Sequence, residues 1–566
     1  MYIVHTSTHH HASSCSRMHL LTMSNSNSSN RNITLLLLIA SIILTSHVHG
    51  TTPDSDIIKS SCITTLYPDI CYSTLSTTKN LVTKKDVIQL AINKTKETIR
   101  GNFNAIKQLA STSNLKKRCK IALHDCLEMV AGTLEDLDMV IEELKAYPTK
   151  KSLRQQADDL KTLMSTTITY KETCLDDLFY DLDCKQLSKS IIQGHDLSGK
   201  MCSNILAMIK NMTDTDMAHK PESDVRNLKE EIWPEWLSTR DRKLFGLWGV
   251  EPNVTVAKDG KGNYTTVGAA VKAAPKKSKT RYLIKIAEGV YEENVEVPKN
   301  KPNLMFIGDG REKTIITGSK NVAGGGSTTW TSATVGAMGQ GFLARDITFR
   351  NTAGPSGHQA VALRVGSDLS AFYRCSILAY QDTLYVTTGR QFFVNCMIVG
   401  TVDFIFGNAA VVFQFCDILA HRPNRKQRNM VTAQGRTDPN QNTGIVIQRS
   451  KIDATPELKE VQANFSTYLG RPWKKHSRTV VMRSTISDVI KPEGWHRWNK
   501  SSFALDTLYY REYRNVGLGA DTSKRVNWTG WGVMKTKVEA IPFTVGSFIN
   551  GWTWLMSTGF PFWPGW

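Results

Sequence analysis

The chain has 566 residues, of which 41% are hydrophobic and 21% charged. This composition is typical of a soluble globular protein and excludes a disordered or fibrous chain, and the length predicts two domains. The net charge of +19 is uneven: from Gly246 onward 40 Lys and Arg face 23 Asp and Glu, a net +17, so the part before Gly246 is nearly neutral. A strongly basic second half suits a polyanionic partner, of which nucleic acid is the usual first case.

Residues 1–50 are expected to be a leader. The apolar run Ile33–Leu44 follows Arg31 and is short for a membrane span, as is typical of a secretory signal peptide. Because 30 polar residues precede it, we expect translation to start at Met23, or else the segment to act as an uncleaved signal anchor. The run His9–His11 is interpreted as incidental and not as a metal site.

Secretion changes the interpretation of the remaining chain. It argues against nucleic acid and makes the polyanion an extracellular one. It makes the 11 cysteines candidates for disulfides. It also makes the N-x-[ST] sites candidates for glycosylation; these are Asn93, Asn211, Asn253, Asn263, Asn464, Asn499 and Asn527.

Residues 54–212 carry helical periodicity throughout, which predicts an up-down four-helix bundle. Cys62 and Cys71 flank an N-terminal hairpin, while Cys126 and Cys174 fall on different helices and could bridge them. No catalytic constellation is visible in this half. The four amphipathic segments are Val87–Leu109, Ile121–Leu144, Leu153–Leu178 and Leu187–Met212.

Residues 213–245 lose this periodicity and gather charge and proline, which indicates a linker. Its end is the basic cluster Arg240–Phe245, RDRKLF. Two interpretations stay open for this cluster, a solvated linker face and a site of proteolytic processing.

Residues 246–566 change to short β-rich runs and predict an all-β domain. The glycine triplets Gly308–Gly310 and Gly324–Gly326 mark turns and precede no helix, so a nucleotide site is not expected. Val267–Ala274 alone looks helical and could cap an open end of the domain. The Trp- and Gly-rich run from Asn527 is expected to pack irregularly along it.

Three segments of this half share one pattern: FYRCSIL from Phe372, FVNCMIV from Phe393 and FQFCDIL from Phe413. A repeat of about 20 residues in short β-rich runs indicates a coiled solenoid, the right-handed parallel β-helix. Residues one period apart then stack on parallel strands about 4.8 Å apart. Cys375, Cys396 and Cys416 form one such column, and the spacing does not choose which of them pair.

Asp382 and Asp403 lie 21 residues apart and are therefore expected side by side on adjacent coils. Two close carboxylates do not ionise together easily, so one is expected to be an acid and the other a nucleophile or base. Gln381 and Gln359 beside them can donate hydrogen bonds to an oxyanion. A solvated or salt-bridged ladder of aspartates is the alternative interpretation.

The flanking motifs resemble the plant pectin methylesterases. Five motifs occur in the order of that family, and they extend from about Gly246 to the C-terminus: GVYEE from Gly289, QAVAL from Gln359, QDTLY from Gln381, DFIFG from Asp403 and LGRPW from Leu469. The helical half resembles the invertase and pectin methylesterase inhibitors through CITTLYPDIC from Cys62, ALHDCLE from Ala122 and TYKETCLDDL from Thr169.

The resemblance implies hydrolysis of the methyl esters of homogalacturonan, with methanol released and no metal or other cofactor. It implies Asp403 as nucleophile, Asp382 as general acid and then base, and Gln381 and Gln359 as oxyanion donors. Arg471 is expected to pair with Asp403 and keep it ionised. A structural arginine is the alternative for Arg471.

Substrate contacts are expected from aromatic and polar residues near these acids. Trp473 offers a flat face for a sugar ring, with Tyr385 and Phe404 as further candidates, although each alone is more often a core residue. Thr329 matches a substrate-contacting position. Trp330 stands where the family pattern has Phe, so the local sugar contacts are expected to differ.

The resemblance also implies disulfides, processing and location. The implied pairs are Cys62–Cys71, Cys126–Cys174 and Cys396–Cys416, with the remaining thiols, including Cys119, Cys184, Cys202 and Cys375, left free. Processing would cut at Arg242–Lys243, where this chain lacks the usual paired arginines. The expected protein is a monomer in the plant cell wall or apoplast, acted on by a processing protease and open to inhibition by its own helical half.

Two other functions compete with the esterase. A β-helical polygalacturonase or pectate lyase would act on the same polymer, since paired aspartates serve glycoside hydrolysis and an Asp cluster can bind calcium. A non-catalytic inhibitor or wall-binding protein is the second. The presence of all five expected catalytic residues, Asp382, Asp403, Gln359, Gln381 and Arg471, argues against the second.

Overall fold

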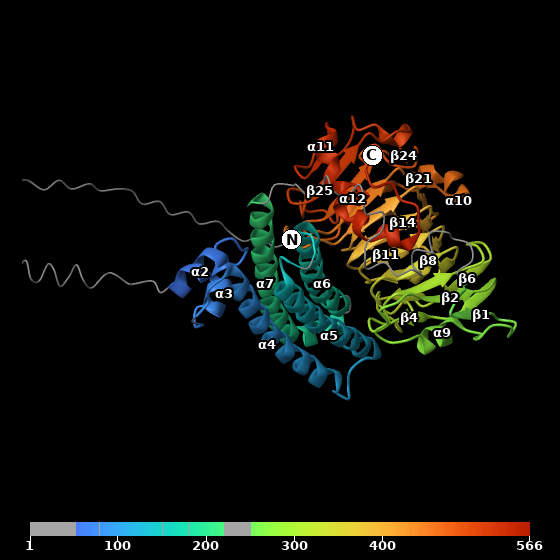
Figure 1. The fold of residues 1–566 in the computed structure, drawn as a ribbon. Helices are drawn as coiled ribbons and strands as arrows, with labels where there is room; N and C mark the ends of the chain where they lie inside the picture. The colour runs from blue at the N-terminus through green and yellow to red at the C-terminus, as the bar shows by residue number, and fades with distance from the viewer. Residues whose placement is uncertain (1–52, 79, 150, 180–181, 220–250, 566) are drawn as a thin grey trace, which may run out of the picture. The chain divides into compact units, whose positions relative to one another are not determined.

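The computed structural model describes residues 53–78, 80–149, 151–179, 182–219 and 251–565 (Figure 1). The expected leader with Ile33–Leu44 and the expected processing site at Arg242–Lys243 lie outside these ranges. Within them, no helix is long and apolar enough to cross a membrane.

The N-terminal half is helical, as expected, and four long helices form its bundle (Figure 1). A capping box begins α4, where the Thr83 hydroxyl accepts a hydrogen bond from the Asp86 N–H and the Asp86 carboxylate accepts one from the Thr83 N–H. The last helix continues to His219, beyond the expected end at Met212. The helices are α2 (Pro53–Cys62), α3 (Pro68–Leu75), α4 (Lys84–Ala110), α5 (Lys117–Ala146), α6 (Leu153–Phe179) and α7 (Leu182–His219).

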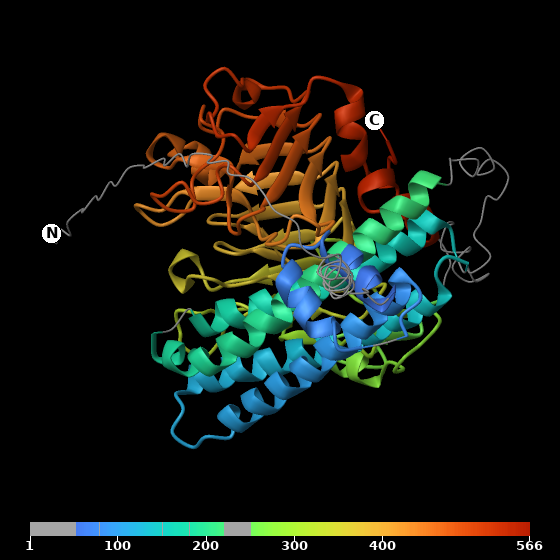
Figure 2. The same ribbon diagram turned by 90° about the vertical axis from the view of Figure 1, so that its left-hand side faces the viewer.

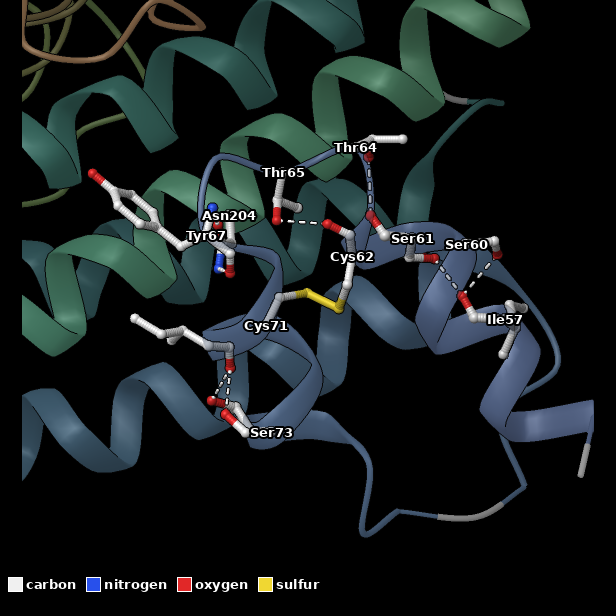
Figure 3. Close-up of a disulfide and its surroundings, with 12 residues drawn as sticks. Ile57, Ser60, Ser61, Cys62, Thr64, Thr65, Tyr67, Cys71, Ser73 and Asn204 are labelled. Atoms are coloured by element: carbon white, nitrogen blue, oxygen red, sulfur yellow. Dashed lines mark hydrogen bonds between the residues drawn. A yellow bond between two sulfur atoms is a disulfide. The ribbon is translucent and has the colours of Figure 1, made fainter. Parts of the chain in front are cut away.

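Disulfides fasten this bundle at several points. Cys62–Cys71 closes the turn between α2 and α3, and Asn204 of α7 holds the same turn by hydrogen bonds to the backbone N–H and carbonyl of Tyr67, at 3.0 and 2.9 Å (Figure 3). Cys126–Cys174 joins α5 to α6, so both pairs are those that the resemblance implied.

A third bridge, Cys119–Cys184, joins α5 to α7 and corrects the expectation that these two thiols are free. Its two cysteines lie 65 residues apart in sequence and meet only when the bundle packs. Cys202 is a buried free thiol, as expected.

The second half is a parallel β-helix of three sheets, and Figure 2 shows its strands stacked in successive coils. From β2 to β23 successive strands enter the sheets in the order A, B, C, and sheet A continues beyond the other two at both ends. Sheet A contains β1 (Val254–Val256), β2 (Tyr282–Ile286), β5 (Leu304–Ile307), β8 (Leu343–Arg345), β11 (Ser370–Tyr373), β14 (Arg390–Val394), β17 (Ala410–Gln414), β20 (Gly444–Gln448), β23 (Arg478–Met482), β25 (Tyr509–Tyr513) and β26 (Trp531–Val533).

Sheets B and C complete the coil. Sheet B contains β3 (Gly289–Glu292), β6 (Thr314–Gly318), β9 (Thr348–Asn351), β12 (Ser376–Leu378), β15 (Met397–Gly400), β18 (Asp417–Ala420), β21 (Lys451–Ala454) and β24 (Thr485–Ile486). Sheet C contains β4 (Val295–Val297), β7 (Val335–Ala337), β10 (Leu363–Val365), β13 (Leu384–Val386), β16 (Ile405–Gly407), β19 (Asn429–Gln434) and β22 (Thr467–Pro472).

The repeating aromatic residues stack inside this coil. Phe372 and Phe393 lie parallel with ring centroids 4.5 Å apart, and Phe393 and Phe413 follow at 4.9 Å. All three side chains are fully buried. The spacing that predicted the solenoid is therefore the spacing of its core.

Cys396 and Cys416 are free thiols in this structure, which corrects the disulfide that the resemblance implied. They lie at the turn from sheet A to sheet B on neighbouring coils, after the ends of β14 and β17. Each thiol instead donates a weak hydrogen bond to a backbone carbonyl of the preceding coil, that of Phe372 and that of Phe393. Cys375 in the same column is also free, as expected.

Short helices cover the ends and one face of the β-helix. Helix α9 (Val267–Ala273) begins where Glu293 accepts hydrogen bonds from the Val267 and Gly268 N–H groups, which gives the GVYEE motif a capping role. The C-terminal segment packs on the outer face of sheet A, as expected, and includes α11 (Lys537–Ala540) and α12 (Val545–Phe548). A further short helix is α10 (Pro456–Lys459).

Candidate active site

Asp382 and Asp403 occupy equivalent positions on adjacent coils. Strands β13 and β16 pair with Leu384 opposite Ile405, so the two aspartates, each two residues earlier, are aligned. Both have left-handed backbones, with φ of 62° and 49°. This conformation is uncommon outside glycine, and such residues cluster at functional sites. Each aspartate remains only 6–7% exposed.

Arg471 at the end of sheet C holds Asp403 in a two-pronged ion pair. Its Nε and a terminal nitrogen donate to the two carboxylate oxygens at 2.7 and 2.5 Å. The guanidinium also lies over the ring of Trp498, 4.4 Å from its centroid. Burial lowers the pKa of Arg471, but the charge and hydrogen bonds of Asp403, together with the charge of Asp382, outweigh burial, so this pKa is raised. The pair therefore fixes Asp403 as an oriented carboxylate.

Asp382 has the opposite electrostatic environment. Burial, followed by the negative charge of Asp403, raises its pKa well above the usual range of an aspartate, against the opposing charge of Arg471. A buried carboxyl of this kind holds its proton more tightly than an exposed aspartate does and can donate it. The two aspartates thus have the unequal character that acid and nucleophile need.

Gln381 and Gln359 lie on adjacent coils beside these acids. The Ala360 N–H donates to the Gln381 carbonyl at 3.2 Å, so the backbone segments that carry the two glutamines lie side by side. The side-chain oxygen of Gln359 is buried and accepts no hydrogen bond from any described residue.

An aromatic row lines the outer face of sheet C. Tyr385 stacks on Phe406 with centroids 4.2 Å apart, and Phe406 lies 5.9 Å from Trp473. Phe404, expected at the site, is instead fully buried in the core of the β-helix. Phe406, which was not among the expected contacts, occupies the outward position two residues later.

Thr329 lies in a loop whose neighbours the structure ties down. Trp330 is buried, and the guanidinium of Arg364 lies 3.6 Å from its ring centroid. Arg364 in turn pairs with Glu296 at 2.7 Å. Thr329 itself is half-buried, and its carbonyl accepts a hydrogen bond from Ser332.

Helix α6 of the helical half lies against this row. Lys474, next to Trp473, pairs with Asp176 at 2.6 Å and with Glu172 at 3.4 Å. The hydroxyls of Thr173 and Tyr385 are 3.4 Å apart. The aromatic row also belongs to one apolar cluster with the bundle's core, so the helical half covers the outer face of sheet C.

A polar face of α6 continues this contact. Thr166 hydrogen-bonds to Thr388 at 2.6 Å, and Asn408 donates to the Thr169 hydroxyl at 2.9 Å. Four threonines of this face recur at helical spacing and are buried at 8% exposure or less: Thr162, Thr166, Thr169 and Thr173. This run of small polar residues is the feature of the sequence that marks the contact.

Helix α5 adds two buried carboxyl groups to the contact. The Thr328 hydroxyl donates to Asp125 at 2.6 Å, and Lys299 pairs with Asp136 at 2.6 Å. Burial raises the pKa of Asp125 to about 6 in spite of the Thr328 hydrogen bond. Burial likewise raises the pKa of Asp136 to about 6 against the charge of Lys299.

Comparison with known proteins agrees with both halves. The Pectinesterase family model matches residues 253–552, and the model of the plant invertase/pectin methylesterase inhibitor family matches residues 56–208. The chain is 58% identical over 523 residues to Pectinesterase 3 of Citrus sinensis, covering 91% of this chain and 89% of the relative. It is 56% identical over 517 residues to Pectinesterase/pectinesterase inhibitor U1 of Solanum lycopersicum, covering 89% and 88%.

A solved structure covers the second half alone. Pectin methylesterase from carrot is 67% identical and aligns with a TM-score of 0.55, covering 56% of this chain and 99% of its own. The β-helix with its paired aspartates, the inhibitor-like bundle and these matches together lead to one conclusion: the chain belongs to the pectinesterase family and carries an N-terminal domain of the plant invertase/pectin methylesterase inhibitor family.

Proposed function

We propose that this chain hydrolyses the methyl esters of pectin to methanol and pectate, as an esterase of the plant cell wall. The observation that carries the proposal is the pair of aligned aspartates, one held by Arg471 in a two-pronged ion pair and the other with a raised pKa. Methyl ester hydrolysis needs one nucleophile and one proton donor, and the two residues match these needs.

Asp403 attacks the carbonyl carbon of the ester, and the carbonyl oxygen becomes an oxyanion. Gln381 and Gln359 stabilise this oxyanion through their side-chain N–H groups. The intermediate collapses by breaking the C–O bond to the methoxy group, which leaves as methanol with the proton of Asp382. An acid anhydride then joins Asp403 to the uronate.

Water completes the cycle. Asp382, now a carboxylate, takes a proton from water, and the hydroxide attacks the anhydride. Cleavage returns Asp403 as a carboxylate and leaves a uronic acid on the polymer, which loses its proton to solvent and becomes the uronate, while Asp382 is again protonated. Arg471 orients Asp403 through both steps, since its guanidinium holds both carboxylate oxygens.

The aromatic row supplies the sugar contacts in this proposal. Trp473 and Phe406 present flat faces beside the acids, with Tyr385 stacked behind them. Thr329 adds a polar contact at the edge.

A second proposal concerns regulation. The helical half, an inhibitor-family domain, suppresses the enzyme half of the same chain by covering this row. The contact of Lys474 with Glu172 and Asp176 supports it, because it places α6 next to Trp473. A tethered inhibitor acts at high effective concentration, so modest affinity is sufficient.

Cleavage at Arg242–Lys243 by a secretory-pathway protease would release the enzyme half as a monomer. The carrot enzyme, which matches the second half over 99% of its own length, supports an independently folded enzyme half. The expected glycosylation sites fit secretion, because all are exposed except half-buried Asn211.

The test is to assay the secreted chain, before and after cleavage of the linker, on highly methylated pectin. Methanol and polymer length are measured together. Methanol release at constant polymer length supports the esterase. Shortened polymer or unsaturated ends would instead indicate the glycosidase or the lyase, and equal activity of both forms would contradict the inhibition.

A further inference from the structure

A column of arginines follows one corner of the β-helix, at the turn from sheet A to sheet B. Arg449, Arg483 and Arg514 each follow the last residue of a sheet A strand, and the strand registers place them directly above one another. We call these three residues the arginine column. Their spacing is that of the coils, about 4.8 Å.

The backbone conformation of this turn does not explain why arginine occupies it. Each residue of the column has a left-handed backbone, with φ of 52°, 53° and 48°. Asn and Asp adopt this conformation most readily after glycine, and Asn395 and Asp346 occupy the same turn on earlier coils. Arginine at three successive coils is therefore explained by its side chain.

No described carboxylate forms an ion pair with any of the three side chains. On an earlier coil, by contrast, Arg374 at the same turn is neutralised by Asp346 at 2.7 Å. Arg483 and Arg514 are exposed. Burial and then the charge of Arg483 lower the pKa of Arg449, so like charges face each other along the column. An anionic ligand would relieve this repulsion.

Aromatic side chains flank the column. The guanidinium of Arg449 lies 5.1 Å from the ring centroid of Trp563, whose side chain is 51% exposed. Phe415, on the coil before Arg449, is 42% exposed. Guanidinium groups beside exposed aromatic rings can bind a ligand that carries both carboxylates and the apolar faces of sugar rings.

The column is separate from the catalytic aspartates. Asp382 and Asp403 lie where sheet B turns into sheet C, and the helical half contacts sheet C and the turn that follows it. In a coil of three sheets, the corner between sheets A and B lies opposite sheet C. A ligand at the column therefore leaves the catalytic cleft free.

We infer that the arginine column, with Trp563 and Phe415, is a binding site for de-esterified galacturonan, the polyanionic product of the proposed reaction. One sugar unit of an extended (1→4)-linked chain is close in length to one coil. Successive uronates can thus meet successive guanidinium groups. The identity of the ligand rests on the proposed function, whereas the polyanion site rests on the column itself.

The test is calorimetric titration of the full secreted chain with an oligogalacturonate of about ten units. The second ligand is the same oligomer with its carboxyl groups converted to primary amides, which is neutral and is not an ester. The variant is Arg449→Gln, Arg483→Gln and Arg514→Gln together. Its matched control is Lys276→Gln, Lys277→Gln and Lys279→Gln, three exposed lysines elsewhere on the β-helix with the same charge change.

The arginine variant is expected to bind the oligogalacturonate about tenfold more weakly, since exposed charge pairs contribute modestly and three are lost. The lysine control is expected to keep at least half of the wild-type affinity. Trp563→Ala, which changes no charge, is expected to weaken binding severalfold and carries the test if the arginine variant melts early. Equal losses in the arginine variant and the lysine control, or equal binding of the acid and the amide, would overturn the inference. Affinity is measured without turnover, so the result stands apart from the proposed catalysis.

Discussion

The contact of α6 with Lys474 gives a quantitative test of autoinhibition. We call the chain covered when the helical half packs on the outer face of sheet C, and open when it does not. Glu172→Gln with Asp176→Asn removes both carboxylates that pair with Lys474 in the covered state. Both substitutions lie on the helical half, so the released enzyme half is unchanged. In the covered state Lys474 then loses both partners, while in the open state water solvates it.

The magnitude follows from the burial of Lys474. Removing the partner of a fully buried charge costs about 3–5 kcal/mol. The Lys474 side chain is 18% exposed, so water offsets part of this cost. We expect the two substitutions to destabilise the covered state relative to the open one by about 1–3 kcal/mol. Since 1.4 kcal/mol is a factor of ten, the open fraction and the initial rate of the uncut chain should rise about 5- to 150-fold.

The assay is methanol release from highly methylated pectin by the purified uncut chain. The matched control is Glu142→Gln with Asp196→Asn, which removes two exposed carboxylates from pairs within single helices. The control should match wild type, and all cut forms should be equally active. An unchanged rate of the uncut Glu172 and Asp176 variant, with normal melting, would refute the inhibitory contact.

Three further predictions concern the acid, pH and processing. Asp382→Asn should slow methyl ester hydrolysis at least a hundredfold but slow an ester with an activated leaving group far less, because that group needs no proton; equal losses on both esters would remove Asp382 as proton donor. Burial in the covered state raises the pKa values of Asp125 and Asp136 to about 6. Protonation of these two groups therefore stabilises the covered state fully below the ordinary aspartate pKa, and this stabilisation is lost as pH rises through about 6. The activity of the uncut chain relative to the cut one should therefore rise from about pH 4 to pH 6, and a ratio independent of pH would contradict the burial of these groups at the contact. Arg242→Ala with Lys243→Ala should block release of the second half on secretion, and normal release, seen by the mass of the secreted protein, would exclude this site.

The sequence predicted the β-helix because its core repeats at the coil spacing. Phe372, Phe393 and Phe413 are both the repeat and the interior stack. The same spacing aligned Asp382 with Asp403, since a period of one coil places residues beside each other whatever the local backbone does.

Positions next to a corner were not predictable from strand alternation. The alternation is interrupted at this corner, so that Phe404 and Ile405 both face the core and Phe406 faces outward. A regular alternation from Asp403 would place Phe406 inside. The failure to identify Phe406 follows from this interruption.

Contacts between distant segments were the least accessible to the sequence. Cys119 and Cys184 meet only through the packing of α5 and α7, and no spacing encodes their pairing. The threonine face of α6 carries a visible pattern, but a pattern of small polar residues does not name its partner. The burial of Tyr385 beneath α6 therefore required the three-dimensional structure.

The most direct test of the central claim is a single assay of Asp403→Asn and wild type. The cut proteins act on fully methylated galacturonan while methanol and chain length are measured together, with circular dichroism to show that both are folded. Wild type should release methanol at constant chain length, and the variant should lose at least 99% of this rate, because a neutral amide in place of the Asp403 carboxylate is no nucleophile. A folded variant that keeps a tenth of the wild-type rate, or a wild type that shortens the polymer, would contradict the account.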